Sequence, residues 1–303
     1  MKKLSLRAIL AFLAVYIFWG GTYVAIKLGL DSFPPMILAG IRHSTAGLIM
    51  LSVALLRKDA FPKPKEALAS VLIGLMMLLI GNGLVTLSEK TVPSSIVSLV
   101  IGAVPLWIIL INWSFGDKKR PTLFHLIGVF LGILGIALLV FQSQQNVGTQ
   151  LDPLGLILVL IAATSWAGGS LVSRNATLPK SPYMNLSIQM LSGGSALLIG
   201  ATLRSEWAQF DVSAVTTNAW LSLFYLIFFG SIIAYSAYIW LLKNVDPTWV
   251  STYAFVNPIV AVFLGWLLAN ESLSSNTLIA AMIIVISIFF MTFTFKRKAY
   301  SHQ

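Results

Sequence analysis

Residues 251–262 read Ser-Thr-Tyr-Ala-Phe-Val-Asn-Pro-Ile-Val-Ala-Val, and they lie inside an apolar run from about residue 248 to residue 269. A run of about 20 mostly apolar residues is long enough to cross a bilayer as a helix. A proline inside it removes a backbone donor and leaves a carbonyl, here near Ala254, without its helical partner. Pro105 occupies the same place in an earlier apolar run, from about 93 to 115. The two runs therefore predict membrane helices that are interrupted at matching positions.

Working outward from these two runs, the chain contains eight more of the same kind. The ten predicted spans cover residues 7–29, 34–56, 67–88, 93–115, 122–141, 153–174, 182–203, 218–242, 248–269 and 276–295. The connections between them are too short to form a soluble domain. The sequence thus predicts an all-α membrane protein with ten transmembrane helices.

The composition excludes several other classes of protein. Of the 303 residues, 57% are hydrophobic and 10% are charged, whereas a globular protein averages about 25% charged residues. A soluble enzyme or DNA-binding domain could not bury so much apolar surface, and a disordered chain would be polar. There is no cysteine, so disulfides, thiolate chemistry and Cys-based metal sites are excluded as well.

The formal net charge of +10 follows the predicted spans. If the N-terminus is cytoplasmic, the cytoplasmic segments carry 16 of the 20 Lys and Arg residues. Cytoplasmic loops of membrane proteins are enriched in these residues. We therefore expect both termini in the cytoplasm, and the basic excess requires no nucleic-acid partner.

The two halves of the chain resemble each other, and residues that are superposed by a fixed shift are here termed offset partners. A shift of 147 residues superposes residues of the same type in spans one, two, six and seven: Trp19 on Trp166, Gly21 on Gly168, Pro35 on Pro182. A shift of 153 does the same in spans three, four, eight and nine: Lys90 on Lys243, Ser98 on Ser251, Pro105 on Pro258. Because each repeat holds five spans, the second is inserted upside down, which is the architecture of many alternating-access transporters. The predicted domains are repeat 1 at 7–141, an inter-repeat loop at 142–152 and repeat 2 at 153–296.

The motifs of the chain resemble those of the drug/metabolite transporter superfamily, EamA type. The similar stretches are residues 16–23, 34–42, 81–83, 165–167, 229–234 and 251–262, the last continuing to Glu271. The resemblance implies two inverted five-helix repeats around a central cavity, formed mainly by spans one, three, four, six, eight and nine. It also implies efflux or exchange of small metabolites, amino acids or drugs across the bacterial inner membrane.

Polar and aromatic residues recur at helical spacing on several spans and predict a substrate pathway. They are Tyr16, Trp19, Tyr23, Asn82, Thr86, Ser98, Pro105, Trp166, Ser231, Tyr235, Tyr253, Asn257 and Pro258. A lipid-facing helix gains nothing from such residues at mid-depth, so these faces should line protein or water. Interhelical hydrogen bonds, worth about 1 kcal/mol each, are the alternative role for the polar members. Trp19 and Trp166 could equally serve as packing anchors.

Charged and titratable residues near the spans form a second set of candidates: Arg42, His43, Glu89 and Glu271. An arginine inside a span is costly and marks either function or a buried partner. Arg42 could bind a carboxylate-bearing substrate, or it could bond helix-end carbonyls and fix the repeat interface; its offset partner is the neutral Gln189. Glu89 and Glu271 lie at the outer ends of spans, where helix capping, pairing with lysine and recruitment of cationic substrates all stay open. No carboxylate is expected at mid-membrane, so proton coupling is not indicated.

Taken together, the residues and the resemblance predict a secondary transporter that exports small metabolites, amino acids or drugs by alternating access. Uptake or facilitated movement through the same fold, and a non-transporting sensor or assembly role, stay open. No enzymatic activity, metal or cofactor is expected, because the chain has no P-loop, HExxH or GxSxG motif. The expected partners are a small-molecule substrate and the lipid bilayer, with no nucleic acid, and a homodimer stays open.

Overall fold

A computed structural model describes residues 5–115, 123–145, 152–245, 250, 253–269 and 275–293, and the regular elements in these ranges are all helical. Within these ranges seven helical segments are long and apolar enough to cross a membrane: Leu6–Gly29, Pro35–Leu56, Pro64–Ser88, Ser94–Ile111, Pro153–Asn175, Pro182–Leu203 and Thr217–Asn244. Three shorter apolar helices cover Leu123–Gly135, Val256–Leu268 and Leu278–Ser287. These segments overlap the predicted spans, and the predicted all-α membrane fold is confirmed.

Several spans are built from more than one helical piece. The α-helices are α1 Leu6–Ala14, α2 Gly20–Gly29, α3 Pro35–Leu56, α4 Pro64–Gly74, α5 Gly83–Ser88, α6 Ser94–Ile101, α7 Val104–Phe115, α8 Leu123–Gln145, α9 Pro153–Asn175, α10 Pro182–Leu203, α11 Thr217–Tyr225, α12 Ser236–Asn244, α14 Tyr253–Leu268 and α15 Ser275–Phe293. Three π-helical segments, Val15–Trp19, Leu75–Asn82 and Leu226–Tyr235, join α1 to α2, α4 to α5 and α11 to α12. Two 3₁₀ turns, Glu206–Gln209 and Val212–Ala214, lie between α10 and α11.

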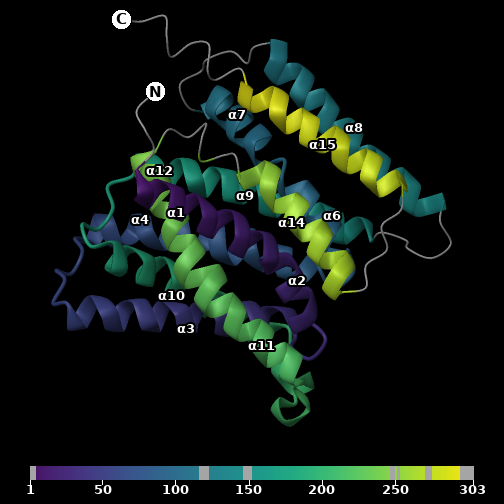
Figure 1. The fold of residues 1–303 in the computed structure, drawn as a ribbon. Coiled ribbons are helices and arrows are strands. Elements are labelled where there is room, and N and C mark those ends of the chain that lie inside the picture. Colours follow the sequence, from purple (N-terminus) through teal and green to yellow (C-terminus); the bar gives the residue numbers. More distant parts are fainter. Residues whose placement is uncertain are drawn as a thin grey trace, which may run out of the picture.

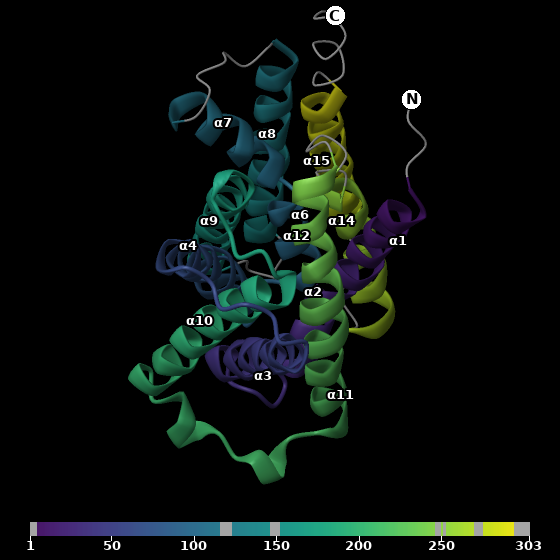
Figure 2. The same ribbon diagram turned by 90° about the vertical axis from the view of Figure 1, so that its left-hand side faces the viewer.

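Two helix pairs lie at opposite edges of the molecule. Helices α8 and α15 pack against each other at one edge, and α3 packs against α10 at the other (Figure 1). Figure 2 shows α3 and α10 side by side again after a quarter turn. Helices α2, α9 and α14 lie between these two pairs (Figure 1).

The two central prolines affect their helices differently. The span that contains Pro105 is interrupted, because α6 ends at Ile101 and α7 begins at Val104. The predicted interruption at Pro258 is wrong for the described residues, since α14 runs through this proline from Tyr253 onward. A β-carbon placed on Gly102 would lie 3.3 Å from the carbonyl oxygen of Ala254 and 3.2 Å from Pro258 Cγ. The break in one span therefore packs directly on the proline of the other.

Helices α3 and α10 pack in antiparallel contact through glycines. A β-carbon placed on Gly47 would lie 2.9 Å from the amide nitrogen of Leu191, and one placed on Gly194 would lie 2.6 Å from that of Ser44. Gly47 and Gly194 are offset partners, and so are Ser44 and Leu191. The two contacts are therefore equivalent, as in an interface between two copies of one surface. Small residues permit this close approach, which is how helices associate where the solvent is lipid.

We predict that Gly194→Ala lowers the melting temperature of the purified protein in detergent. The added methyl group meets backbone atoms of α3, which cannot rotate away, and overpacking of this kind costs about 1–3 kcal/mol. Gly168→Ala is the matched control, because a β-carbon there meets only the flexible end of Met76. Equal melting temperatures for the two variants would contradict the close packing of α3 on α10.

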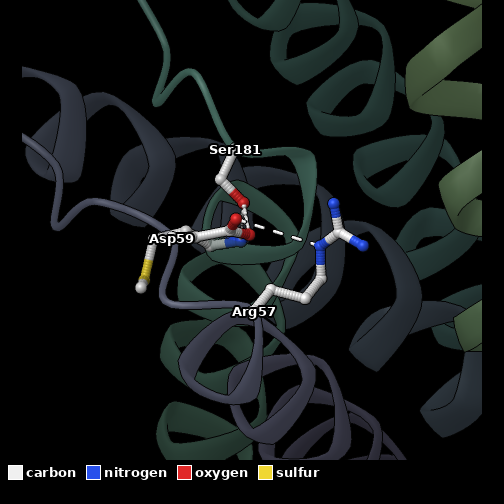
Figure 3. A network of polar contacts seen from close by, with 4 residues as sticks. Arg57, Asp59 and Ser181 are labelled. Atoms are coloured by element: carbon white, nitrogen blue, oxygen red, sulfur yellow. Dashed lines mark hydrogen bonds and ion pairs between the residues drawn. The ribbon is translucent and has the colours of Figure 1, made fainter.

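Each end of the α3–α10 pair is tied by an acidic side chain. Asp59, beyond the end of α3, accepts a hydrogen bond of 2.5 Å from Ser181 Oγ, the N-cap of α10 (Figure 3). At the opposite end Glu206, beyond the end of α10, accepts hydrogen bonds from the backbone N–H groups of Met36 and Ile37 at 2.9 and 3.2 Å. These N–H groups belong to the first turn of α3, whose own N-cap residue supplies no side-chain acceptor. Asp59, which follows α3, thus holds the start of α10, and Glu206, which follows α10, holds the start of α3.

The two turns that carry these acids occupy corresponding positions in the sequence and have similar backbone geometry. Arg57-Lys58-Asp59 and Arg204-Ser205-Glu206 are offset partners residue by residue. Nε of Arg57 lies 3.9 Å from Asp59 Oδ1, and Nε of Arg204 lies 3.7 Å from Glu206 Oε1. The central residues of the two turns, Lys58 and Ser205, have φ of 57° and 54°, and among the described residues they are the only non-glycines with positive φ. The αL conformation ends each helix and turns the acid toward its partner.

We predict that Glu206→Ala destabilises the protein by about 1 kcal/mol, the usual cost of losing a helix cap. The measurement is the melting temperature in detergent. Asp211→Ala is the control, because Asp211 is exposed in the same loop and bonds only to its own turn, which holds the pKa of its carboxyl below the usual value. If the two alanine variants have the same melting temperature, Glu206 does not anchor α3.

Candidate functional site

A cavity of about 60 Å³ lies at the centre of the molecule, between the two edge pairs. It is lined by Trp19, Thr22, Tyr23, Ile26, Arg42, His43, Leu78, Gly81, Asn82, Val85, Ile101, Ala162, Trp166, Gly230, Ser231, Tyr235 and Tyr253. These residues come from spans one, three, four, six, eight and nine, as the family resemblance implies, and also from span two through Arg42 and His43. The cavity therefore draws on both halves of the chain.

Aromatic rings from both halves meet at one wall of the cavity. The rings of the offset partners Trp19 and Trp166 contact each other edge to face, with centroids 5.4 Å apart. Tyr253 lies edge to face on Trp19 at 5.6 Å, and the buried Tyr238 packs against both tryptophans at 4.8 and 5.9 Å. Trp19 Nε1 also donates a hydrogen bond of 3.0 Å to the carbonyl of Gly230 in span eight. Aromatic packing and this bond fix the two indoles in place.

The polar side of the cavity is organised around Arg42, which is 3% exposed. Its Nε donates to Ser231 Oγ at 2.8 Å, and its Nη1 donates to Asn82 Oδ1 at 3.3 Å. His43 Nε2 lies 2.9 Å from the same amide oxygen, which only accepts, so this nitrogen donates. Among the described residues the hydrogen-bond partners of Arg42 are thus side chains of spans three and eight and not helix-end carbonyls. Because these two spans belong to different halves of the chain, a role of Arg42 in fixing the repeat interface stays open.

The π-helical segments place two of the polar groups. Asn82 ends the segment Leu75–Asn82, and its offset partner Tyr235 ends the segment Leu226–Tyr235. Tyr235 Oη donates a hydrogen bond of 2.6 Å to Gln189 Oε1. This bond corresponds to the one between Arg42 and Asn82, because Gln189 and Tyr235 are the offset partners of those two residues. π-helical turns in α-helices are frequent at functional sites. The two halves therefore hold equivalent residue pairs with different chemistry, and of the second pair only Tyr235 lines the cavity.

Nine of the predicted residues line the cavity: Trp19, Tyr23, Arg42, His43, Asn82, Trp166, Ser231, Tyr235 and Tyr253. The other described candidates lie outside its lining: Tyr16, Thr86, Ser98, Pro105, Asn257, Pro258 and Glu89. Glu271 lies outside the described residues, as do Ser251 and Thr252 of the stretch quoted first.

The candidates outside the lining make contacts within the bundle. Thr86 donates to the carbonyl of Asn82 at 3.0 Å, and Ser98 donates to that of Ser95 at 2.7 Å. Glu89 is the C-cap of α5 and is fully buried, and its backbone carbonyl accepts a bond of 3.2 Å from Lys27 Nζ. Burial of this acid could not be foreseen from its place at the end of an apolar run.

Eight lining residues were not among the predicted site residues, and two of them, Thr22 and Gly230, contact the groups described above. A β-carbon placed on Gly230 would lie 2.8 Å from Thr22 Cγ2 and 2.9 Å from Arg42 Nη2, so Gly230 makes room for the guanidinium. Thr22 lines the cavity and donates to the carbonyl of Trp19 at 2.6 Å. Its spacing of three residues from Trp19 is a helical signal that could have found it.

We predict that Asn82→Ala lowers stability by about 1–3 kcal/mol, because Arg42 and His43 lose the oxygen to which both donate. Asn82→Asp restores most of the loss, since a carboxylate keeps the acceptor and pairs with Arg42. Melting temperature in detergent is the readout, with the exposed Asn175→Ala as control. A fully stable Asn82→Ala protein would show that this network does not hold the fold.

Comparison with known proteins agrees with this architecture. The model of the EamA-like transporter family matches residues 6–141 and 153–293. The chain is 39% identical to the "Uncharacterized inner membrane transporter YedA" of Escherichia coli (strain K12) over 93% of its own length and 89% of that protein. It is 28% identical to the "Probable amino-acid metabolite efflux pump" of the same strain, over 95% of each chain. A protein of known crystal structure, 18% identical, superposes with a TM-score of 0.66 over 95% of this chain and 96% of its own, which supports the fold.

Proposed function

This chain belongs to the EamA-like transporter family, and on that premise we propose that it exports a small metabolite by alternating access through the central cavity. The observation that carries the proposal is the contact between Trp19 and Trp166, which brings offset partners from the two halves together at the cavity. In transporters built from inverted repeats, the substrate site lies near the bilayer midplane at the repeat interface. The resemblance to an efflux pump supports export as the direction.

We further propose that the chain crosses the membrane ten times as two inverted repeats, divided at residues 142–152. Helix bounds support this proposal. α3, Pro35–Leu56, and α10, Pro182–Leu203, correspond end for end at the shift of 147. At the shift of 153, the segment that begins at Pro64 corresponds to the one that begins at Thr217, and the π-helical segments in both end on offset partners. The three shorter apolar helices would supply the remaining spans.

The orientation that we propose places both termini in the cytoplasm, within a bacterial inner membrane. The distribution of 16 of 20 basic residues supports it, because these residues are retained on the cytoplasmic side. The relative from Escherichia coli, which is an inner membrane transporter by name, supports the compartment.

Alternating access needs two states of similar free energy, and equivalent contacts offer one route to them. Thr22 of span one packs on Gly230 of span eight, and Met77 of span three packs on Gly169 of span six. These are offset partners exchanged between the halves, since Thr22 corresponds to Gly169 and Met77 to Gly230. A rearrangement that exchanges the two environments would open the cavity to the opposite side.

The proposal is tested with the purified full chain in liposomes, by counterflow of a panel of radiolabelled amino acids, organic acids and amines. We expect at least one solute to exchange faster than in empty vesicles. Trp19→Ala and Trp166→Ala should each lower that rate about tenfold, as expected when ring contacts worth about 1 kcal/mol or more are lost. Trp113→Ala is the control, because Trp113 is exposed and lies outside the cavity lining.

Exchange that is indistinguishable from empty vesicles for every solute would overturn the transport proposal. Oriented vesicles then separate export from uptake, because only one orientation responds to a substrate gradient if the protein is obligatorily coupled. Equal rates for the Trp19→Ala and Trp113→Ala proteins would place the transport site elsewhere.

A further inference from the structure

We propose that the central cavity selects a small organic anion with one carboxylate and a compact apolar group, and that Arg42 is the residue that binds the carboxylate. This inference rests on the proposed role of the cavity as the transport site. It adds the chemical class of the substrate of this chain, which membership of the family does not determine.

The charge of the cavity lining supports the inference. Arg42 is the permanently charged residue of the lining, and no Asp or Glu in the described part of the chain lines the cavity. Among the described residues Arg42 has no ion-pair partner within 4.0 Å. Glu89 interacts with Arg42 electrostatically but does not border the cavity. An anion that enters would therefore meet a guanidinium without an acid to displace.

The hydrogen bonds of Arg42 leave one edge of its guanidinium without acceptors among the described residues. The group has five N–H donors, and the described residues accept from two of them, one on Nε and one on Nη1. The two donors on Nη2 and the second donor on Nη1 have no acceptor in the described residues. The edge formed by Nη1 and Nη2 is thus available for the paired hydrogen bonds that arginine makes to a carboxylate.

The fixed position of Arg42 makes such recognition specific. Ser231 holds Nε, Asn82 holds Nη1, and His43 steadies the oxygen of Asn82 from the other side. Gly230 leaves the space that Nη2 occupies. A preorganised donor pair loses little side-chain entropy when a ligand binds.

The rest of the lining limits the ligand to a compact apolar body. Trp19, Trp166, Tyr235 and Tyr253 form an aromatic wall, and Ile26 lies among the aliphatic residues that close the space. A water needs about 10–15 Å³ of such volume, so a cavity of about 60 Å³ has room for about four to six waters or a ligand of similar size. An ammonium group would find no carboxylate among the described lining residues, which disfavours amines and amino acids relative to simple acids.

The test compares four probes of nearly the same shape: isovalerate, isovaleramide, isopentylamine and valine. Binding to the full chain in detergent is measured by titration calorimetry at neutral pH. We expect isovalerate to bind at least about tenfold more tightly than each of the other three, as charge-assisted bonds to the guanidinium would produce. Equal or tighter binding of the amide, the amine or valine would overturn the inference.

Variants then assign the selectivity to Arg42. Arg42→Gln should remove the preference for isovalerate over isovaleramide, and Arg42→Lys, which keeps the charge but not the paired donors, should reduce it. Arg174→Gln is the matched control, because Arg174 is exposed at the end of α9. If Arg42→Gln does not fold, the Arg42→Lys variant is the test. An unchanged preference for isovalerate over isovaleramide in that variant would overturn the role of the guanidinium.

Counterflow of the same probes separates this inference from the proposed function. Exchange of isovaleramide or isopentylamine without exchange of isovalerate would overturn the anion selectivity while leaving transport intact. Absence of exchange for these probes and for the wider panel would overturn transport itself. Exchange of isovalerate that is lost in Arg42→Gln and kept in Arg174→Gln supports both.

Discussion

The close antiparallel contact of α3 and α10 is the constraint on which the rest of the structure depends. Lipid offers no hydrophobic drive for helix association, so these helices must gain their stability from close packing and from polar ties. Gly47 and Gly194 permit the packing, and Asp59 and Glu206 tie the ends. Because each tie joins the end of one helix to the start of the other, the pair is fixed in register along its whole length.

This register determines where Arg42 lies. The guanidinium leaves α3 toward the centre of the molecule and reaches Ser231 in span eight, so it bridges the two halves of the chain. Burying a charge in a membrane protein is costly unless polar partners surround it. The π-helical turns bring Asn82 and Ser231 to those positions, and Gly230 provides the space. The polar cavity is therefore a consequence of how an edge helix pair is locked and how two central spans are wound.

Much of the fold was predictable from hydropathy and from the two shifts, since the predicted spans 34–56 and 182–203 match α3 and α10 to within a residue. The ties at the helix ends were not predictable, because Asp59 and Glu206 look like ordinary loop charges in the sequence. The π-helical segments were also unforeseeable, since the register of hydrogen bonds inside an apolar helix leaves no trace in hydropathy. Pro258 shows that a sequence signal can also predict too much. A proline indicates a missing backbone donor, but packing decides whether the helix breaks, and α14 continues through Pro258.

The proposed repeats place unlike chemistry on a nearly symmetric frame. Where one half presents Arg42 bonded to Asn82, the other presents Gln189 bonded to Tyr235. A symmetric frame gives two states of similar free energy, which is what a transporter must interconvert. The arginine lines the cavity, whereas its offset partner Gln189 does not and carries no charge. Symmetry thus suits the motion, whereas recognition of a charged solute requires that the symmetry be broken at the site.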